Sequence, residues 1–349
     1  LEKPFAPNEQ EMREIVDCAK KNDSKVMICH VLRYTPFYYA IKERVYNGEI
    51  GDIINIQQTE HVSYHHLSTS YVRGKWANSK KCHTSMLLAK SCHDMDIMMW
   101  MMSATKPTQI ASFGSKFQFK PENAPEGAGT ICMKDCPYVD TCVYSTKRLY
   151  IDHPDRWAFY VWDALEGKEN PTIEDKIELM KSDSPYARCI YKCDNDVVDH
   201  QSVLINFASG ATGTLNMIGG SAEPRRDIHI IGTKGEIFGN FEESKFTVLK
   251  IDPSPEAHHE ECDVEEVDLK VTGDMVGAYG GHGGGDERLA ADFVKFIRGE
   301  KPSLACTSIF DSVAGPLCVY LADNSRENGG IPQEVKLCLL YTSPSPRDG

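Results

Sequence analysis

The chain has 349 residues, of which 41% are hydrophobic and 26% charged, the balance of a folded globular protein rather than of a disordered one. A formal net charge of −13 without a basic stripe argues against a nucleic-acid partner. The longest apolar run, Met95–Met102, is interrupted by Asp96 and is too short to cross a bilayer, so we expect no membrane partner. Thirteen cysteines spread over the chain without a framework spacing indicate reduced thiols or a metal site, so we expect the reducing cytoplasm.

Residues 1–33 predict part of a βαβ unit. A helix pattern covers Asn8–Asn22, with Asn8 as the N-cap and Glu11 at the capping-box position. Lys25–Val31 is a short apolar run that fits a buried strand. A strand end, a helix and a buried strand are the building block of a doubly wound parallel sheet, and one such unit cannot bury its own faces. We therefore expect residues 1–33 to be the remnant of a dinucleotide-binding domain whose other strands precede residue 1.

Residues 34–335 predict an α+β domain with an open, mainly antiparallel sheet and flanking helices. Alternation of apolar and polar residues indicates strands, and longer apolar periodicity indicates helices. We expect strands at Asp52–Glu60, Gln201–Phe207, Thr212–Ile218, Asp227–Ile231 and Glu236–Gly239, and helices at Thr35–Gly48, His83–Ser103, Asp286–Arg298 and Ser308–Asn324. Residues 336–349 break this pattern with Ser-Pro alternation, and we interpret them as a non-native, adapter-derived tail.

A cysteine cluster lies in a Pro- and Gly-rich stretch with little periodicity, residues 121–144, which needs something to hold it. Four thiolates around Zn²⁺ would do so in a closed structural site. We predict as zinc ligands Cys132, Cys136, Cys142 and Cys193, with Cys189 as the substitute. The spacing is wider than in the cysteine pairs of zinc ribbons, so a set of reduced, partly buried thiols remains the alternative.

Two further clusters combine hydrogen-bonding groups with aromatic faces, as a polyhydroxylated ligand requires. The first follows the strand that ends at Glu60 and contains His61, Tyr64, His66 and Trp76. The second contains Asp199 and His200 at the start of a later strand. The alternatives are a surface loop for the first cluster and strand capping toward water for the second.

Three short motifs together resemble one family. These are Glu2-Lys3-Pro4 after a strand, His93 in the Met-rich helix, and Gly232-Thr-Lys-Gly235 between late strands. Their order and spacing resemble the glucose-fructose oxidoreductase / inositol dehydrogenase / rhizopine-catabolism (Gfo/Idh/MocA) family, and the likeness covers residues 1 to about 335. The resemblance implies a Rossmann domain that binds NAD or NADP, followed by an open sheet that forms the substrate site and usually an oligomer interface. The glycine run 280–286 follows no parallel-strand pattern, so we interpret it as a substrate-side loop that contains His282 and is capped by Asp286.

The resemblance also implies roles for individual residues. Lys3 would hydrogen-bond the reacting hydroxyl and stabilise the developing alkoxide, and His93 would take the hydroxyl proton. The family commonly has an Asp four residues before this histidine. Here Ala89 stands at that position, so we expect that either Asp94 or Asp96 orients His93, or Lys90 replaces part of the lost function. On the cofactor side we place Glu2, Lys3, Pro4 and Arg33.

Three functions follow from this pattern. The first is hydride transfer between NAD or NADP and a hydroxyl of a sugar, sugar derivative or cyclitol, in a homo-oligomer associated through the sheet. The second is a glycosidase that keeps NAD tightly bound and cleaves by oxidation and elimination, as some members of the family do. The third is a non-catalytic, zinc-stabilised binding protein.

Overall fold

The computed structural model describes residues 1–153, 159–258, 261–270 and 284–337. Its strands form one nine-stranded sheet in the order β8-β7-β6-β5-β1-β4-β3-β2-β9. Strands β1 and β4 are parallel, and all the other neighbours are antiparallel. The strands are β1 Ile53–Ser63, β2 Pro107–Ser115, β3 His200–Phe207, β4 Thr212–Ser221, β5 Arg225–Gly232, β6 Gly235–Asn240, β7 Lys245–Ile251, β8 Cys262–Asp268 and β9 Gln333–Glu334. The open, mainly antiparallel sheet predicted from sequence is confirmed.

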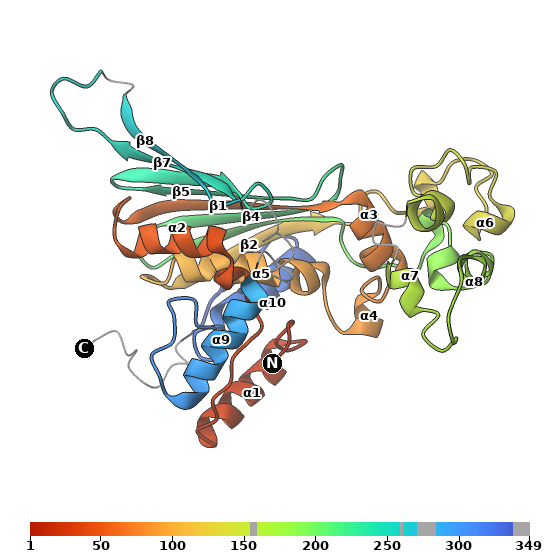
Figure 1. Ribbon diagram of the computed structural model, residues 1–349, viewed down its shortest axis with the longest axis horizontal. Helices are drawn as coiled ribbons and strands as arrows, with labels where there is room; N and C mark the ends of the chain where they lie inside the picture. Colours follow the sequence, from red (N-terminus) through yellow and green to blue (C-terminus); the bar gives the residue numbers. More distant parts are fainter. Residues whose placement is uncertain (154–158, 259–260, 271–283, 338–349) are drawn as a thin grey trace.

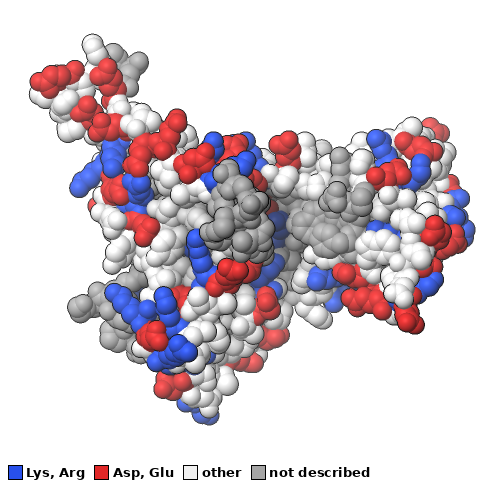
Figure 2. Space-filling model, in the orientation of Figure 1, with Lys and Arg blue, Asp and Glu red and all other residues white. Residues whose placement is uncertain are grey.

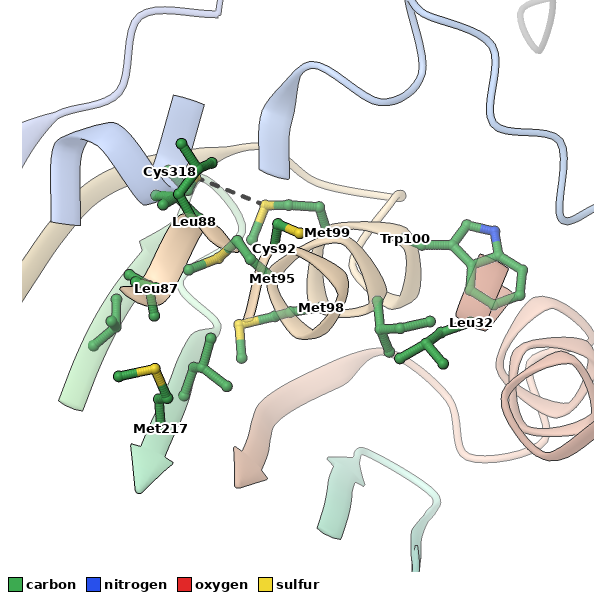
Figure 3. Close-up of a cluster of buried hydrophobic side chains, with 14 of the residues drawn as sticks. Leu32, Leu87, Leu88, Cys92, Met95, Met98, Met99, Trp100, Met217 and Cys318 are labelled. Carbon is green, nitrogen blue, oxygen red and sulfur yellow. Dashed lines mark hydrogen bonds between the residues drawn. The ribbon is translucent and has the colours of Figure 1, made fainter. Parts of the chain in front are cut away.

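The longer helices lie on one side of this sheet, as Figure 1 shows. They are α1 Glu9–Lys21, α2 Pro36–Tyr46, α5 Met86–Met101, α9 Gly285–Arg298 and α10 Ala314–Glu327. Helix α5 is central: its Met95, Met98 and Met99 pack between the sheet and α10, and Trp100 points toward Leu32 (Figure 3). Among the described residues, no helix has the length and apolar character needed to cross a membrane.

The segment between β2 and β3, residues 116–199, forms an extension beyond one end of the sheet (Figure 1). Its helices are short: α6 Cys132–Asp135, a π-type turn Lys147–Asp152, α7 Phe159–Asp163 and α8 Ile173–Leu179. Beside it lie α3 Tyr64–His66, the π-type segment Leu67–Arg73 and α4 Ser79–Cys82 (Figure 1). On the face drawn in Figure 2, acidic and basic side chains are interspersed over both the sheet-and-helix body and the extension.

The first helix is confirmed, whereas the strand predicted after it is wrong. Asn8 caps α1 by accepting a hydrogen bond from the Glu11 backbone N–H at 2.9 Å. In the predicted strand Lys25–Val31 only Met27 makes a bridge, to Ser308. The backbone of this segment makes hydrogen bonds to Leu1 and to residues 307 and 309. Within the described residues, these bonds are too few to form a strand pair.

Two predicted helix starts need correction. The last helix begins at Ala314 rather than Ser308, because the Ser308 hydroxyl bonds Asp311 and the residue pairs with Met27. Helix α9 is capped by Gly284, which has φ +84°, a conformation that glycine adopts without strain. Asp286 lies in the first turn of α9, so it is not the cap that the sequence suggested. Sequence periodicity also missed β2, β7, β8 and β9.

Candidate active site

A cavity of about 390 Å³ opens where the amino-terminal segment, α5, β5 and α9 meet. Its lining comes from parts of the chain that are far apart in sequence: Glu2, Lys3, Cys29, Val31, Leu32, His66, Ser70, Tyr71, Trp76, Lys90, His93, Tyr160, Arg226, Phe241, Asp286 and Leu289. Lys3 and His93, which the sequence assigned to the chemistry, thus lie on the same cavity. This size fits a small polar ligand with part of a cofactor beside it.

Lys3 is held against the first half of α5. Its ammonium donates a hydrogen bond of 3.2 Å to the backbone carbonyl of Ala89. Ala89 has no carboxylate, and the hydrogen bond from Lys3 goes to its main-chain oxygen. This oxygen lies one helical turn before His93, so the lysine ammonium stays near the histidine. Helix α5 is itself fixed at this end by Ser85, whose hydroxyl accepts from the Leu88 backbone N–H at 3.0 Å.

His93 has the surroundings of a neutral base. Its side chain is buried, with 8% exposed, and Nδ1 has no hydrogen-bond partner among the described residues. Burial holds the pKa of His93 well below its usual range, and the neighbouring cations act in the same direction: Lys3, His30, Arg226 and Lys90. A neutral imidazole at neutral pH can accept a proton from a ligand hydroxyl.

A buried network of charges forms one wall of the cavity. Glu60 and Arg226 face each other across the β1–β5 pair, with Arg226 Nε 2.5 Å from Glu60 Oε2 and 2.9 Å from Asp94 Oδ1. Lys90 Nζ lies 2.8 Å from Glu60 Oε1. Burial lowers the pKa of Lys90, and repulsion from Arg226 adds to this effect. Asp94 binds Arg226 through Oδ1, whereas its Oδ2 is buried without a hydrogen-bond partner among the described residues, so its orienting role for His93 stays a prediction.

Behind His93 lies a second buried cluster, which contains His30, Arg33 and Asp96. Arg33 is 3% exposed, binds Asp96 through Nε at 2.7 Å and Nη2 at 2.5 Å, and stacks 5.7 Å from the Trp100 ring centre. It does not line the cavity. Its guanidinium is occupied inside the core, so the structure gives no support to the predicted contact of Arg33 with the cofactor.

Residues 42–308 match the family model described as the oxidoreductase family, C-terminal alpha/beta domain, of Gfo/Idh/MocA proteins. The chain belongs to the Gfo/Idh/MocA oxidoreductase family. YteT, a protein of Bacillus subtilis (strain 168) named as an oxidoreductase, is 26% identical over 296 residues, which are 83% of this chain and 65% of that protein. The chain thus spans less than two thirds of that relative's length.

Two solved structures show that the fold is shared at low identity. A levoglucosan dehydrogenase in complex with NADH and levoglucosan is 16% identical, with a TM-score of 0.62 over 96% of this chain and 72% of that one. A super-repressor mutant of Gal80p from Saccharomyces cerevisiae is 14% identical, with a TM-score of 0.60 over 98% of this chain and 73% of that one. The Gfo/Idh/MocA fold is therefore common to a dehydrogenase and a repressor, so function has to be argued from the site.

Of the predicted substrate residues that the structure describes, two lie on the cavity of this Gfo/Idh/MocA chain. His66 and Trp76 line it, and burial, with the neighbouring cations, lowers the pKa of His66 to about 2. Tyr64 lies outside the lining and makes an edge contact with Tyr144 of the extension. His61 lies on β1 with its Nε2 3.9 Å from Asp227.

The second predicted substrate cluster is structural. Asp199 accepts hydrogen bonds from the backbone N–H groups of Phe117 and Gln118 at 2.9 and 2.7 Å, and it contacts His200 at 2.9 Å. Neither residue lines the cavity, and Asp199 is buried rather than facing water, so neither the ligand contact nor the strand cap describes it. His282 lies outside the described residues.

Sequence reasoning missed Arg226 and His30, and it counted Tyr71 only as part of the aromatic cluster after Glu60. Arg226 and Tyr71 carry no local motif, because only strand pairing and folding bring them to the cavity. His30 interrupts the apolar run that ends at Val31, and a histidine in a run this apolar needs a buried partner. That signal could have identified it.

The predicted zinc site gains no support. Cys132, Cys136, Cys142 and Cys189 line a separate hollow of about 20 Å³, but Cys193 does not, and its sulfur lies 3.4 Å from the Cys189 carbonyl oxygen. In the parts of the chain that the structure describes, no three His, Cys, Asp or Glu side chains are grouped so that they could hold a metal ion. The described cysteines form no disulfide, and the zinc site and the reduced thiols both stay predictions.

Proposed function

We propose that the chain supplies the substrate site of an NAD- or NADP-dependent oxidoreductase that acts on a hydroxyl of a sugar, sugar derivative or cyclitol. The observation that carries this proposal is that Lys3 and His93 line one cavity. A dehydrogenase with the same fold has been solved with NADH and levoglucosan, which supports a ligand of this class.

The chain's own residues would handle the proton and the charge. The Lys3 ammonium would donate a hydrogen bond to the substrate oxygen, and neutral His93 would accept the hydroxyl proton. Lys90, fixed by Glu60, would keep a second positive charge beside the developing alkoxide. Bound NAD or NADP would supply the hydride acceptor.

The described residues fit only one end of such a cofactor. Glu2 and Lys3 lie on the cavity, where they would contact the nicotinamide end, with Pro4 following them. Within the described residues, one mainly antiparallel sheet is present, and it offers no parallel strand with a glycine-rich phosphate loop. We therefore expect the described residues to contribute little affinity for the pyrophosphate.

The cavity walls suit a ligand with several hydroxyl groups. His66 and Ser70 offer hydrogen-bonding groups, and Tyr71 and Trp76 add aromatic surface on which a sugar ring can pack. Such a mixture orients a polyol without requiring a charged ligand.

A panel of sugars and cyclitols tests the proposal in the protein that contains this chain. With NAD⁺ or NADP⁺ present, we expect one sugar class to give rising reduced-nicotinamide absorbance, and Lys3→Met or His93→Asn to abolish it. Release of an aglycone without net nicotinamide reduction would instead identify the oxidation–elimination glycosidase, for which Ala89 in place of the family's Asp leaves room. Ligand binding without turnover, unchanged by either substitution, would identify the non-catalytic binding protein.

The open face of the sheet supports association of two or more copies. The longer helices cover the other face (Figure 1), and large apolar side chains stand exposed on this one. Strand register places these side chains on a single face: Phe113, Leu204, Ile218, Phe238, Ile251 and Val264. We expect light scattering to show an oligomer that Leu204→Glu dissociates, whereas a monomeric unsubstituted chain would contradict this assembly.

A further inference from the structure

His30, Arg33 and Asp96 form a sealed cluster in contact with the candidate base. His30 and Asp96 are each 1% exposed, and His30 Nδ1 lies 2.6 Å from Asp96 Oδ1. Asp96 follows His93 by three residues on α5, so both side chains leave the same region of the helix. None of the three cluster members lines the cavity.

The charges of this cluster are fixed. Burial acts to raise the pKa of Asp96, but Arg33 and His30 outweigh burial and lower the pKa to about 2. Arg33 holds the carboxylate through two hydrogen bonds, so the carboxylate cannot swing away from His30. The cluster therefore keeps a fixed carboxylate 2.6 Å from His30 Nδ1.

The His30 ring meets His93 directly. The ring centres are 6.1 Å apart, and the planes cross at 68°, an edge-on contact. Nε2 of His30 and Nδ1 of His93 are both buried without a hydrogen-bond partner among the described residues. Such atoms are costly to bury, and they recur where a function requires them.

We propose that His30 is a positioning residue for His93: held by Asp96 and Arg33, it fixes the His93 ring and sets the pH at which that ring takes a proton. The role of His93 as a base rests on the proposed function, but the coupling of the two rings does not. This cluster stands on the buried side of His93, whereas Ala89 leaves the position of the family's acidic residue without a carboxylate.

The sign of the coupling follows from the charges that face His93. Lys3 comes from the amino-terminal segment and Arg226 from β5, while Lys90 and Asp94 come from α5 itself and His30 from the segment before the turn Val31–Tyr34. His30 acts with the cations and lowers the pKa of His93. A neutral side chain at position 30 removes that effect, so His93 should take up its proton at a higher pH.

Long-range ¹H–¹⁵N NMR of the chain, without cofactor or substrate, tests this coupling by reading the charge on each imidazole during a pH titration. In His30→Phe, which keeps the ring volume without a charge, we expect the protonation midpoint of His93 to rise by about one pH unit. The matched control is His61→Phe, because His61 lies on β1 outside the cavity lining and should leave the midpoint unchanged.

An unchanged His93 midpoint in His30→Phe, or an equal rise in the His61 control, would overturn the proposal. If His30→Phe does not fold, His30→Leu gives the same reading, because it also removes the imidazole from this contact, and an unchanged His93 midpoint in that variant would refute the coupling. Since neither reading uses turnover, failure here leaves the proposed reaction standing, and failure of the sugar panel leaves this coupling standing.

Discussion

The body of the molecule and its extension differ in the size of their apolar clusters and in their polar contacts. In the body, every residue of α5 except Lys90 is buried, and the helix packs between the sheet and α10 (Figure 3). The extension has a separate small cluster of buried side chains: Leu149, Tyr150, Val161 and Met180. It is tied to the body by Arg73, whose guanidinium donates to the carbonyls of Arg188 and Tyr144, both at 2.8 Å. Residues of the extension such as Phe119 and Ile190 also join the main core, so apolar burial stabilises both regions and Arg73 adds a polar anchor between them.

The two regions contribute different groups to the cavity: the body supplies the candidate catalytic residues, and the extension supplies part of the wall. The rigid body supplies Lys3, His93 and the Glu60–Arg226 pair, whereas the extension adds Tyr160 to the lining. Catalytic groups need fixed positions, and a wall needs only to close off water and fit the ligand. We therefore expect substitutions in the body to change catalysis or global stability, and substitutions in the extension to change ligand fit or local stability.

The largest contrast is expected between His93 and Tyr160, which line the same cavity from the two regions. Replacement His93→Asn should lower kcat/KM by about 10²–10⁴-fold, because it removes the proton acceptor. Tyr160→Phe should mainly change KM, since the ring remains in place. Steady-state kinetics on the sugar identified by the panel would check this, and equal losses in kcat for both variants would erase the distinction.

Arg226 tests how much the body depends on its buried charges. Arg226→Met leaves Glu60 and Asp94 without their guanidinium and should cost about 3–5 kcal/mol of the free energy of unfolding. Its neighbour Arg225 provides the control, because the side chain is 53% exposed and pairs with Asp227 at the surface, so Arg225→Met should change stability by less than about 0.5 kcal/mol. Urea unfolding measures both, and similar midpoints would show that the network contributes little.

Arg73 tests the anchoring of the extension. Arg73→Leu removes the hydrogen-bond donor from two part-buried carbonyls. We expect it to lower the free energy of unfolding by about 2–3 kcal/mol, mostly through local unfolding of the extension. Limited proteolysis should then cut within residues 116–199 while the sheet stays intact. The surface variant Arg148→Leu loses one exposed hydrogen bond and serves as control. Cleavage spread evenly over body and extension would show that the two regions unfold together.

The smallest expected effect is a pH dependence that arises in the body. Because the folded-state pKa of Asp96 is lowered to about 2, its stabilisation is fully present above the unfolded pKa of about 3.9 and is lost as pH falls toward 2. The difference amounts to about 2 kcal/mol. Compared with Asp96→Asn, the unsubstituted chain should lose this extra stability between about pH 5 and pH 2, and parallel pH curves would contradict the assignment.

The body was also the part that sequence could predict. Alternation located β3, β4 and β5, and the N-cap Asn8 located α1, because these signals are local. The extension has short helices without periodicity, although the capping box of Thr172 and Asp175 was a local signal for α8. Asp199 accepts its hydrogen bonds from Phe117 and Gln118, far away in sequence, and no local pattern could predict that contact.

The candidate site was only half predictable for the same reason. The family resemblance placed Lys3 and His93, and composition suggested His66 and Trp76. The pairing of Glu60 with Arg226 depends on the register of β1 against β5, and the contact of His30 with Asp96 depends on how α5 packs. Such relations between distant residues are fixed by the fold and leave no trace in spacing.

A double-substitution cycle on Lys3 and His93 tests the central claim most directly. If the two side chains act on one hydroxyl, Lys3→Met and His93→Asn should each lower kcat/KM strongly, and the double variant should be about as slow as the slower single variant. Losses that multiply in the double variant would show that the two residues act independently, and would contradict a shared proton-and-charge site in this cavity.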